Sequence, residues 1–201
     1  MVILMIVRKA NKDDDLKRIA ELIYKTDPYI YPYWFENLDN CLEELPPLLV
    51  DDKFFFNVDH IYVSIVEDKI VGLVCILEKN TDLNYDYTEL KKKNSRYLYT
   101  IENYIEKLIE EVKNADFAYI SNVCVIDDYR GRGVGKTMLD DVMQIFTEKM
   151  YRHFVLDVVA DNIAAVKMYN NLSFEQFTKI FSGFSDPGVQ KPDVYSMEYK
   201  I

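Results

Sequence analysis

The chain has few of the residues that crosslink small proteins or bind metals. Among its 201 residues are three cysteines and two histidines. Cys41, Cys75 and Cys124 are odd in number, lie far apart and show no CxxC spacing, which argues against a disulfide scaffold and favours reduced thiols. With only His60 and His153 beside them, we expect no metal site. A domain of this length buries roughly 70% of its unfolded surface, so it needs no crosslink to fold.

The sequence also lacks a long apolar segment and an excess of positive charge. Residues 1–7 are apolar but too short to span a bilayer, and they have no basic residue before them and no small-residue cleavage site after them. The acidic side chains number 34 and the basic ones 24, which gives a net charge of −10. Because nucleic acids and anionic membranes bind clustered Lys and Arg, we expect neither as a partner. We expect a cytoplasmic protein, and the charge favours a cationic substrate.

The order of apolar patterns predicts one mixed α/β domain over residues 1–201, without internal repeats. The expected strands are residues 1–7, 60–66, 70–78, 117–125, 154–159, 174–180 and 194–199, of which the second and third form a hairpin. The expected helices are residues 13–25, 35–45, 136–150 and 163–171, and a helical insertion occupies about 80–114. Pro46 and Pro47 are expected to end the second helix.

The most informative segment is residues 123–137, in which a strand runs into a glycine turn that opens a helix. Main-chain N–H groups and the positive end of the helix dipole converge in such a turn, which favours a bound phosphate. A Walker A loop fails here because Arg130 stands where glycine is needed, and a dinucleotide fingerprint fails at both possible starting points. The pattern that fits is Arg-x-x-Gly-x-Gly, formed by Arg130, Gly133 and Gly135.

This turn resembles the one with which the GCN5-related N-acetyltransferase (GNAT) family grips the pyrophosphate of acetyl-CoA. Residues 156–174 also resemble the fifth strand and fourth helix of that family, with Asn162, Ala165, Tyr169 and Phe174 at matching positions. Ser173 departs from the pattern, because glycine is usual there. The resemblance implies a central mixed, mostly antiparallel sheet of six to seven strands flanked by helices, with the helical insertion between the third and fourth strands.

The same resemblance implies an N-acetyltransferase that moves an acetyl group from acetyl-CoA directly to a primary amine of a small molecule or peptide, in a ternary complex. It also implies that the fourth and fifth strands splay apart to admit the pantetheine arm. Acetyl-CoA is then the only cofactor expected, as a cosubstrate without a metal. The residues that the resemblance assigns to its binding are Val123, Val125, Arg130, Gly131, Arg132, Gly133, Val134, Gly135, Lys136, Asn162 and Tyr169.

Acyl transfer to an amine needs a donor for the developing oxyanion and an acid for the departing thiolate. By resemblance, the main-chain N–H of Val123 is the candidate oxyanion donor. Tyr169 is the candidate acid, because a phenol of pKa about 10 is protonated at neutral pH.

The base that takes the proton of the amine is harder to identify. Many relatives place a carboxylate on the fourth strand, where this chain has Ser121 and Asn122. Neither side chain is a base at an ordinary pKa. The candidates that stay open are a water molecule held by these two residues, and a carboxylate from elsewhere such as Glu78 or Asp157.

The acceptor site is expected beside the aromatic residues 29–35 and the loop at residues 181–187. Aromatic faces near acids suit a cation, although aromatic residues near proline also anchor loops to a core. Two other classes of function stay open: a non-catalytic CoA-binding regulatory domain, and an interaction module that uses the helix at residues 101–112. The chain is expected to be a monomer or a homodimer.

Overall fold

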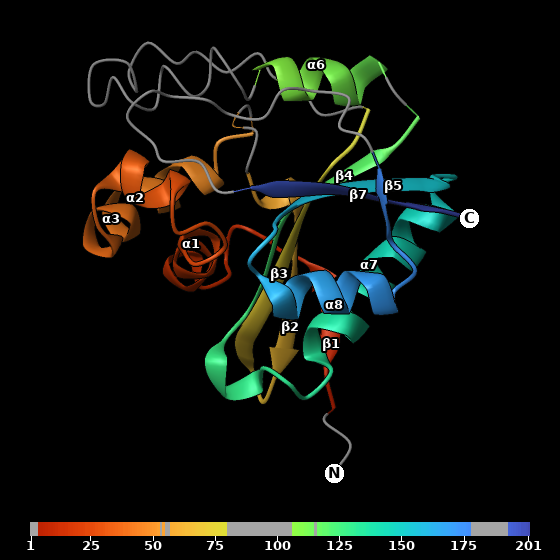
Figure 1. Cartoon of the computed structure of the whole chain (residues 1–201). Helices are drawn as coiled ribbons and strands as arrows, with labels where there is room; N and C mark the ends of the chain where they lie inside the picture. Colours follow the sequence, from red (N-terminus) through yellow and green to blue (C-terminus); the bar gives the residue numbers. More distant parts are fainter. Residues whose placement is uncertain (1–3, 53, 55–56, 80–105, 115, 178–192) are drawn as a thin grey trace.

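The computed structural model describes residues 4–52, 54, 57–79, 106–114, 116–177 and 193–201 (Figure 1). The strands are β1 (Ile6–Lys9), β2 (Ile61–Val66), β3 (Lys69–Leu77), β4 (Ala118–Val125), β5 (His153–Val159), β6 (Glu175–Phe177) and β7 (Val194–Lys200). The helices are α1 (Leu16–Tyr24), α2 (Ile30–Phe35), α3 (Leu38–Leu49), α6 (Glu106–Asn114), α7 (Val134–Glu148) and α8 (Ile163–Asn171), and the short 3-10 turns are η1 (Val58–His60) and η3 (Asp127–Tyr129). None of the described helices has the length and apolar character needed to cross a membrane.

The strands form one sheet of seven in the order β1-β2-β3-β4-β5-β7-β6. Every neighbouring pair is antiparallel except β4 and β5, which are parallel. The last strand of the chain, β7, therefore lies inside the sheet, between β5 and β6. The predicted fold class is confirmed, and so is the hairpin of β2 and β3, whose two turn residues Glu67 and Asp68 both have positive φ.

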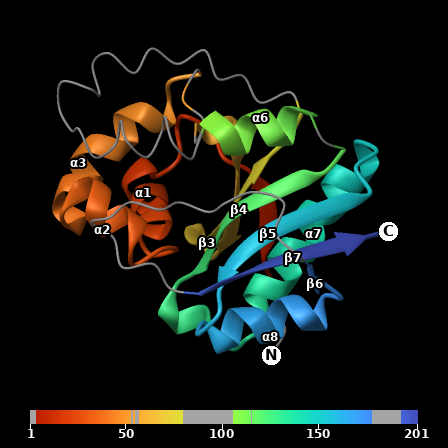
Figure 2. The same cartoon turned by 45° about the horizontal axis from the view of Figure 1, so that its top comes forward.

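Helices cover both faces of the sheet and each face has its own core (Figures 1 and 2). On one face α1, α2, α3 and α6 bury a cluster that includes Ile19, Trp34 and Leu108. On the other face α7 and α8 bury a cluster that includes Phe146 and Tyr169. The cavity described below lies where β4 and β5 pass between these two layers.

The region after α1 differs from the prediction. A single helix over residues 35–45 was expected to end at Pro46, but the structure has α2 followed by α3, and α3 contains both Pro46 and Pro47. A proline inside a helix costs about 3 kcal/mol. Leu45 and Leu49 lie on either side of the prolines and are buried against the core of this face, which offsets that cost. The prediction failed because tertiary packing outweighed local propensity.

Other boundaries shift by a few residues. The helix expected over residues 13–25 is α1, which begins after Asp15, whose side chain accepts a hydrogen bond from the Arg18 N–H. The helix expected over residues 163–171 has those bounds. Of the predicted insertion, α6 is described, whereas residues 80–105 and the predicted loop at residues 181–187 lie outside the described residues.

Candidate active site

The sheet opens between its two parallel strands. Residues 118–120 of β4 pair with residues 154–156 of β5, and no pairing continues beyond them. From there β4 follows β3 as far as Val125, while β5 follows β7 as far as Val159. The two strands therefore separate in the middle of the sheet, as the sequence predicted.

The register of β4 shows which of its amides face the opening. The N–H of Ile126 donates to the carbonyl oxygen of Val71, at 2.9 Å, which continues the ladder with β3. Because donors alternate along an antiparallel strand, the N–H groups of Val125 and Val123 point away from β3, toward the gap with β5. The carbonyl oxygen of Val125 also points away from β3, since it accepts a hydrogen bond from Arg130 Nε at 2.8 Å.

A β-bulge sits at the point where the strands part. Cys75 of β3 pairs with Asn122, whereas its neighbour Ile76 pairs with Ile120, which leaves Ser121 as the extra residue of β4. An extra residue reverses the alternation of side chains along a strand. It turns Asn122 toward α1 and α2, where the Asn122 side chain is 5% exposed. Ser121 Oγ lies 3.3 Å from the carbonyl oxygen of Cys75, to which it donates.

Asn122 connects β4 to the segment between α1 and α2. Its Nδ2 donates to Thr26 Oγ1 at 2.7 Å and to Tyr31 Oη at 2.8 Å, and its Oδ1 has no hydrogen-bond partner among the described residues. Burial raises the pKa of the Tyr31 phenol well above its usual value. Asn122 thus fixes the α1–α2 segment against the bulge.

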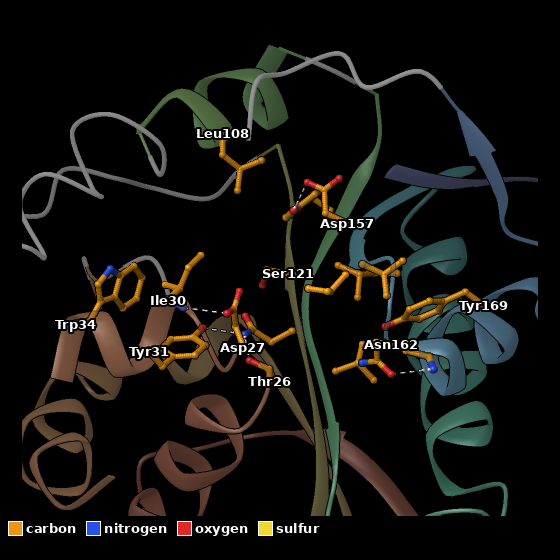
Figure 3. Close-up of a pocket in the computed structure, with 17 residues that line it drawn as sticks. Thr26, Asp27, Ile30, Tyr31, Trp34, Leu108, Ser121, Asp157, Asn162 and Tyr169 are labelled. Carbon is orange, nitrogen blue, oxygen red and sulfur yellow. Dashed lines mark hydrogen bonds between the residues drawn. The ribbon is translucent and has the colours of Figure 1, made fainter. Parts of the chain in front are cut away.

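A cavity of about 170 Å³ lies at the opening between β4 and β5 (Figure 3). One wall comes from the α1–α2 segment, the roof includes Leu108 of α6, and the opposite wall comes from β5 and α8. The cavity therefore joins both layers of the fold at the splayed strands. The lining residues are Thr26, Asp27, Ile30, Tyr31, Trp34, Leu108, Tyr119, Ile120, Ser121, Asn122, Val123, Asp157, Val158, Val159, Asn162, Ala165 and Tyr169.

Tyr169 reaches the cavity from α8 and is held from both sides. Asn162 caps the helix, since its Oδ1 accepts from the Ala165 N–H at 3.2 Å. At the other end, Phe174 N–H donates to the Tyr169 carbonyl and Ser173 N–H to the Asn170 carbonyl, both at 3.0 Å, which is a Schellman motif. The Tyr169 side chain is 7% exposed, and burial raises the pKa of its phenol above the usual value of 10. The phenol is therefore neutral at neutral pH.

The structure separates the two carboxylates that the sequence left as alternatives. Asp157 lines the cavity, where it accepts hydrogen bonds from Ser196 Oγ at 2.5 Å and from Tyr119 Oη at 3.2 Å. Glu78 lies outside the cavity and pairs with Lys149 Nζ at 3.0 Å. Of the two, only Asp157 is placed to meet a substrate between β4 and β5.

The glycine turn leads from β4 into α7 with its amides exposed. Gly131 and Gly133 have φ values of 70° and 84°, and a Cβ at either position would meet nothing within 4 Å. The N–H groups of residues 131–136 make no hydrogen bond within the described part of the chain. Three of these donors precede α7 and three belong to its first turn, and free N–H groups at a helix start favour a bound anion.

Two of the three basic side chains of the turn contact residues of the chain itself. The Arg130 side chain forms an ion pair with Asp127, with Nη1 at 2.8 Å from Oδ1. The guanidinium carbon of Arg132 lies 5.6 Å from the centre of the Tyr129 ring. Lys136 is exposed on the first turn of α7. The backbone is therefore the part of this turn that is already shaped for an anion, and the phosphate contacts of the three basic side chains stay a prediction.

Comparison with known protein families decides the assignment. The model of the acetyltransferase (GNAT) family matches residues 26–174, which is most of the chain and includes both the glycine turn and α8. The chain belongs to the GNAT family. The predicted resemblance is confirmed, and with it acetyl transfer as the general activity.

Solved structures of GNAT enzymes share the fold. An N-acetyltransferase from Staphylococcus aureus Mu50 superposes with a TM-score of 0.66 at 22% identity, covering 96% of this chain and 99% of that one. PaiA N-acetyltransferase from Thermoplasma acidophilum, solved in complex with coenzyme A, gives 0.56 at 14% identity, covering 99% and 100%. The ribosomal-protein-S18-alanine N-acetyltransferase from Escherichia coli gives 0.56 at 13% identity, covering 98% and 94%. No curated protein sequence matches the chain.

Within this GNAT fold, the sequence-predicted residues divide between two places. Ser121, Asn122, Val123, Asn162 and Tyr169 meet at the cavity. The other predicted residues lie along the turn and the end of β4: Val125, Arg130, Gly131, Arg132, Gly133, Val134, Gly135 and Lys136. The two groups meet on β4, where Val125 follows Ser121, Asn122 and Val123, and the turn comes after η3.

Sequence reasoning missed three residues of the GNAT site. Thr26 and Asp27 lie between α1 and α2, and Tyr119 lies on β4 beside Asp157. The Asp27-Pro28 step was available as a helix stop signal, but nothing in the sequence places it near β4. In the described residues no group of three or more His, Cys, Asp or Glu side chains is arranged to hold a metal ion.

Proposed function

We propose that this GNAT protein transfers the acetyl group of acetyl-CoA to a primary amine, by direct attack within a ternary complex. The observation that carries the proposal is the single cavity that joins the Val123 amide, the Tyr169 phenol and the Asp157 carboxylate at the splayed strands. These are the three groups that the reaction needs: an oxyanion donor, an acid and a base.

The glycine turn fits the diphosphate of coenzyme A. The N–H groups of residues 131–136 would donate to it, and the side-chain-free positions 131 and 133 leave room for its oxygens. Acetyl-CoA held there would supply a thioester whose acyl carbon is open to attack by an amine. The pantetheine arm would run along β4 beside the outward-facing amides of Val125 and Val123, toward the cavity.

The proposed roles at the reacting atoms follow from position. The amine nitrogen forms a bond to the acyl carbon while the Val123 N–H stabilises the oxygen that becomes negative. Asp157 receives the proton of the amine, directly or through a water molecule. The carbon–sulfur bond then breaks, and the sulfur leaves as a thiolate that accepts a hydrogen bond from the Tyr169 phenol.

The neutral state of Tyr169 supports its assignment as the acid. Because burial raises the pKa of this phenol, Tyr169 keeps its proton at every pH at which an amine is a useful nucleophile. Proton transfer to a thiolate from such a phenol is uphill by about 2 kcal/mol or more, since the thiol pKa is near 8.5. Tyr169 is therefore expected to act mainly by a strong hydrogen bond to sulfur in the transition state.

The test is thiol release from acetyl-CoA in the presence of a panel of primary amines. We expect release with at least one amine, and a fall in kcat of about 100-fold in Tyr169→Phe, with KM for acetyl-CoA changed little. Tyr62→Phe is the matched control. Tyr62 is buried like Tyr169, with exposed fractions of 5% and 7%, but it packs against Phe146 and does not line the cavity. Tyr62→Phe should leave the rate within about twofold.

The alternative is a CoA-binding domain that regulates without catalysis. Calorimetry together with the thiol assay separates it from the enzyme. If the protein binds coenzyme A but releases no thiol from acetyl-CoA with any amine tested, the regulatory domain is supported and the proposed reaction is overturned. Failure to bind coenzyme A would overturn both.

A further inference from the structure

We propose that the acceptor is a small aliphatic diamine, with one amine at the splayed strands and the second, as an ammonium group, held by Asp27. This inference rests on the proposed function, because it names the acceptor of the same cavity.

The charge of the cavity favours a cation. Of the side chains that line it in the described part of the chain, Asp27 and Asp157 are acidic, and none is Lys, Arg or His. An ammonium group entering this space meets two carboxylates and, among the described lining residues, no positive side chain.

Asp27 has an oxygen available for this contact. Its Oδ1 accepts both the Tyr29 N–H at 2.7 Å and the Ile30 N–H at 2.9 Å, while Oδ2 makes no hydrogen bond among the described residues. The two amides fix the carboxylate and support its negative charge. Asp27 is thus a preorganised anion with one free face.

Aromatic and apolar side chains stand beside this carboxylate. Tyr31 and Trp34 are buried and pack edge to face, with ring centroids 5.3 Å apart, and both line the cavity (Figure 3). Aromatic rings attract ammonium groups through cation–π interaction. Ile30 adds an apolar surface that suits the methylene chain of a diamine.

The two carboxylates lie on different walls, which gives the two amines different fates. Asp157 belongs to β5, whereas Asp27 belongs to the α1–α2 segment, and the two side chains line separate parts of the cavity (Figure 3). The volume of about 170 Å³ is below the roughly 300–1,000 Å³ of sites for drug-sized ligands. The size therefore favours a short diamine over the terminus of a peptide.

The test compares two amines of equal size, 1,4-diaminobutane and n-pentylamine, in which one nitrogen replaces one carbon. In the wild-type protein we expect kcat/KM to be about tenfold or more higher for the diamine, which is the usual worth of a charge-assisted hydrogen bond. In Asp27→Asn this preference, the ratio of the two kcat/KM values, should fall to about twofold. Asparagine keeps the Oδ1 acceptor for Tyr29 and Ile30, so the start of α2 is preserved.

Calorimetric titration of each amine into the coenzyme A complex provides a readout that needs no turnover. The diamine should bind about tenfold more tightly than n-pentylamine, and Asp27→Asn should remove that difference, whereas Asp116→Asn on the exposed surface should keep it. Equal affinity for the two amines, an equal loss of both in Asp27→Asn, or a preference for a peptide amine would overturn the proposal. If no amine causes release of thiol from acetyl-CoA, the proposed function fails. The calorimetric comparison of the two amines still decides whether the diamine site exists.

Discussion

At the scale of single residues, the structure separates side chains that act from side chains that hold. Asn122 stands where many relatives have a carboxylate, yet both donors of its amide are taken by Thr26 and Tyr31. Ser121 donates to the carbonyl of Cys75. Asn122 Oδ1 can still accept a hydrogen bond from a water molecule, so such a water and the Asp157 carboxylate, which lies in the same cavity, both stay candidates for the base.

The role of Asp157 gives the first prediction. Asp157→Asn should lower kcat/KM for an amine about 100-fold at pH 7, because the reacting ammonium group then lacks the carboxylate proposed to take its proton. The deficit should shrink as the pH rises toward the amine pKa of about 10, since the amine is then already deprotonated. Steady-state rates from pH 7 to 10 test this. If the ratio of wild-type to variant kcat/KM stays constant over this range, Asp157 does not act as the base. Asp116→Asn, which removes an acid outside the cavity, is the control.

A second prediction concerns stability. The Asp14 carboxylate accepts hydrogen bonds from Nη1 and Nη2 of Arg8, at 2.8 and 2.5 Å, and from the Asn11 N–H at 2.9 Å. The hydrogen bonds from Arg8 lower the pKa of Asp14 below its ordinary value of 3.8. A lowered folded-state pKa means that the stabilisation is complete above the unfolded-state pKa and disappears as the pH falls through the folded-state pKa.

Asp14→Asn should therefore reduce the free energy of unfolding by about 1 kcal/mol at pH 7, a value discounted for the partial exposure of Arg8. Urea unfolding of both proteins should show the difference narrowing between about pH 4 and pH 2. A difference that is absent at pH 7, or that persists unchanged at pH 2, would count against the ion pair.

At the scale of elements, the end of α8 shows a local rule broken at a functional place. The Schellman motif places Ser173 at a φ of 65°, a conformation that favours glycine, and the ring of the following Phe174 packs 5.8 Å from that of Tyr169. The departure from the family pattern therefore changes the residue while the turn keeps its left-handed form. The motif positions the helix that carries Tyr169.

Ser173→Gly should stabilise the protein by about 0.5–1 kcal/mol, because glycine adopts positive φ without the steric cost that a Cβ brings. Thermal or urea unfolding measures the gain. The kcat for acetyl transfer should change by less than about twofold, since the geometry of the motif is already formed. A loss of stability would show that the serine side chain makes a contact worth more than the strain.

At the scale of the whole molecule, the sheet is two parts joined by a short parallel pairing. β1 to β4 form one part and β5 to β7 the other, and only residues 118–120 and 154–156 pair across the join. The amides of Val123 and Val125 face the opening, while the alternation places those of Asn122 and Cys124 toward β3. A ligand in the opening would contact both parts.

Hydrogen exchange measured residue by residue should reveal this arrangement. In the free protein the Val123 and Val125 amides should exchange faster than those of Asn122 and Cys124, and saturating coenzyme A should slow the first pair about tenfold or more beyond any general stabilisation. Uniform slowing of all four amides would argue against a ligand seated along β4.

Local sequence patterns were enough to predict the order of the seven strands, four of the helices, the hairpin, and the turn at residues 130–136; they missed α2. Each of these depends on local chemistry: periodic apolar residues, glycines with positive φ, and amides left free at a helix start. The two family motifs then carried the assignment of the fold. Local patterns also misled where packing outweighed them, as at Pro46 and Pro47 inside α3.

Only the tertiary structure decided which side chains meet. The bulge at Ser121 turns Asn122 toward α2, and the extra residue leaves no mark in an apolar strand pattern. Asp27 and Asp157 are 130 positions apart in the chain yet line one cavity, while Glu78, which looked equivalent to Asp157 in the sequence, is paired with Lys149 outside it. Contacts between distant segments depend on strand order and register, which no short stretch of sequence encodes.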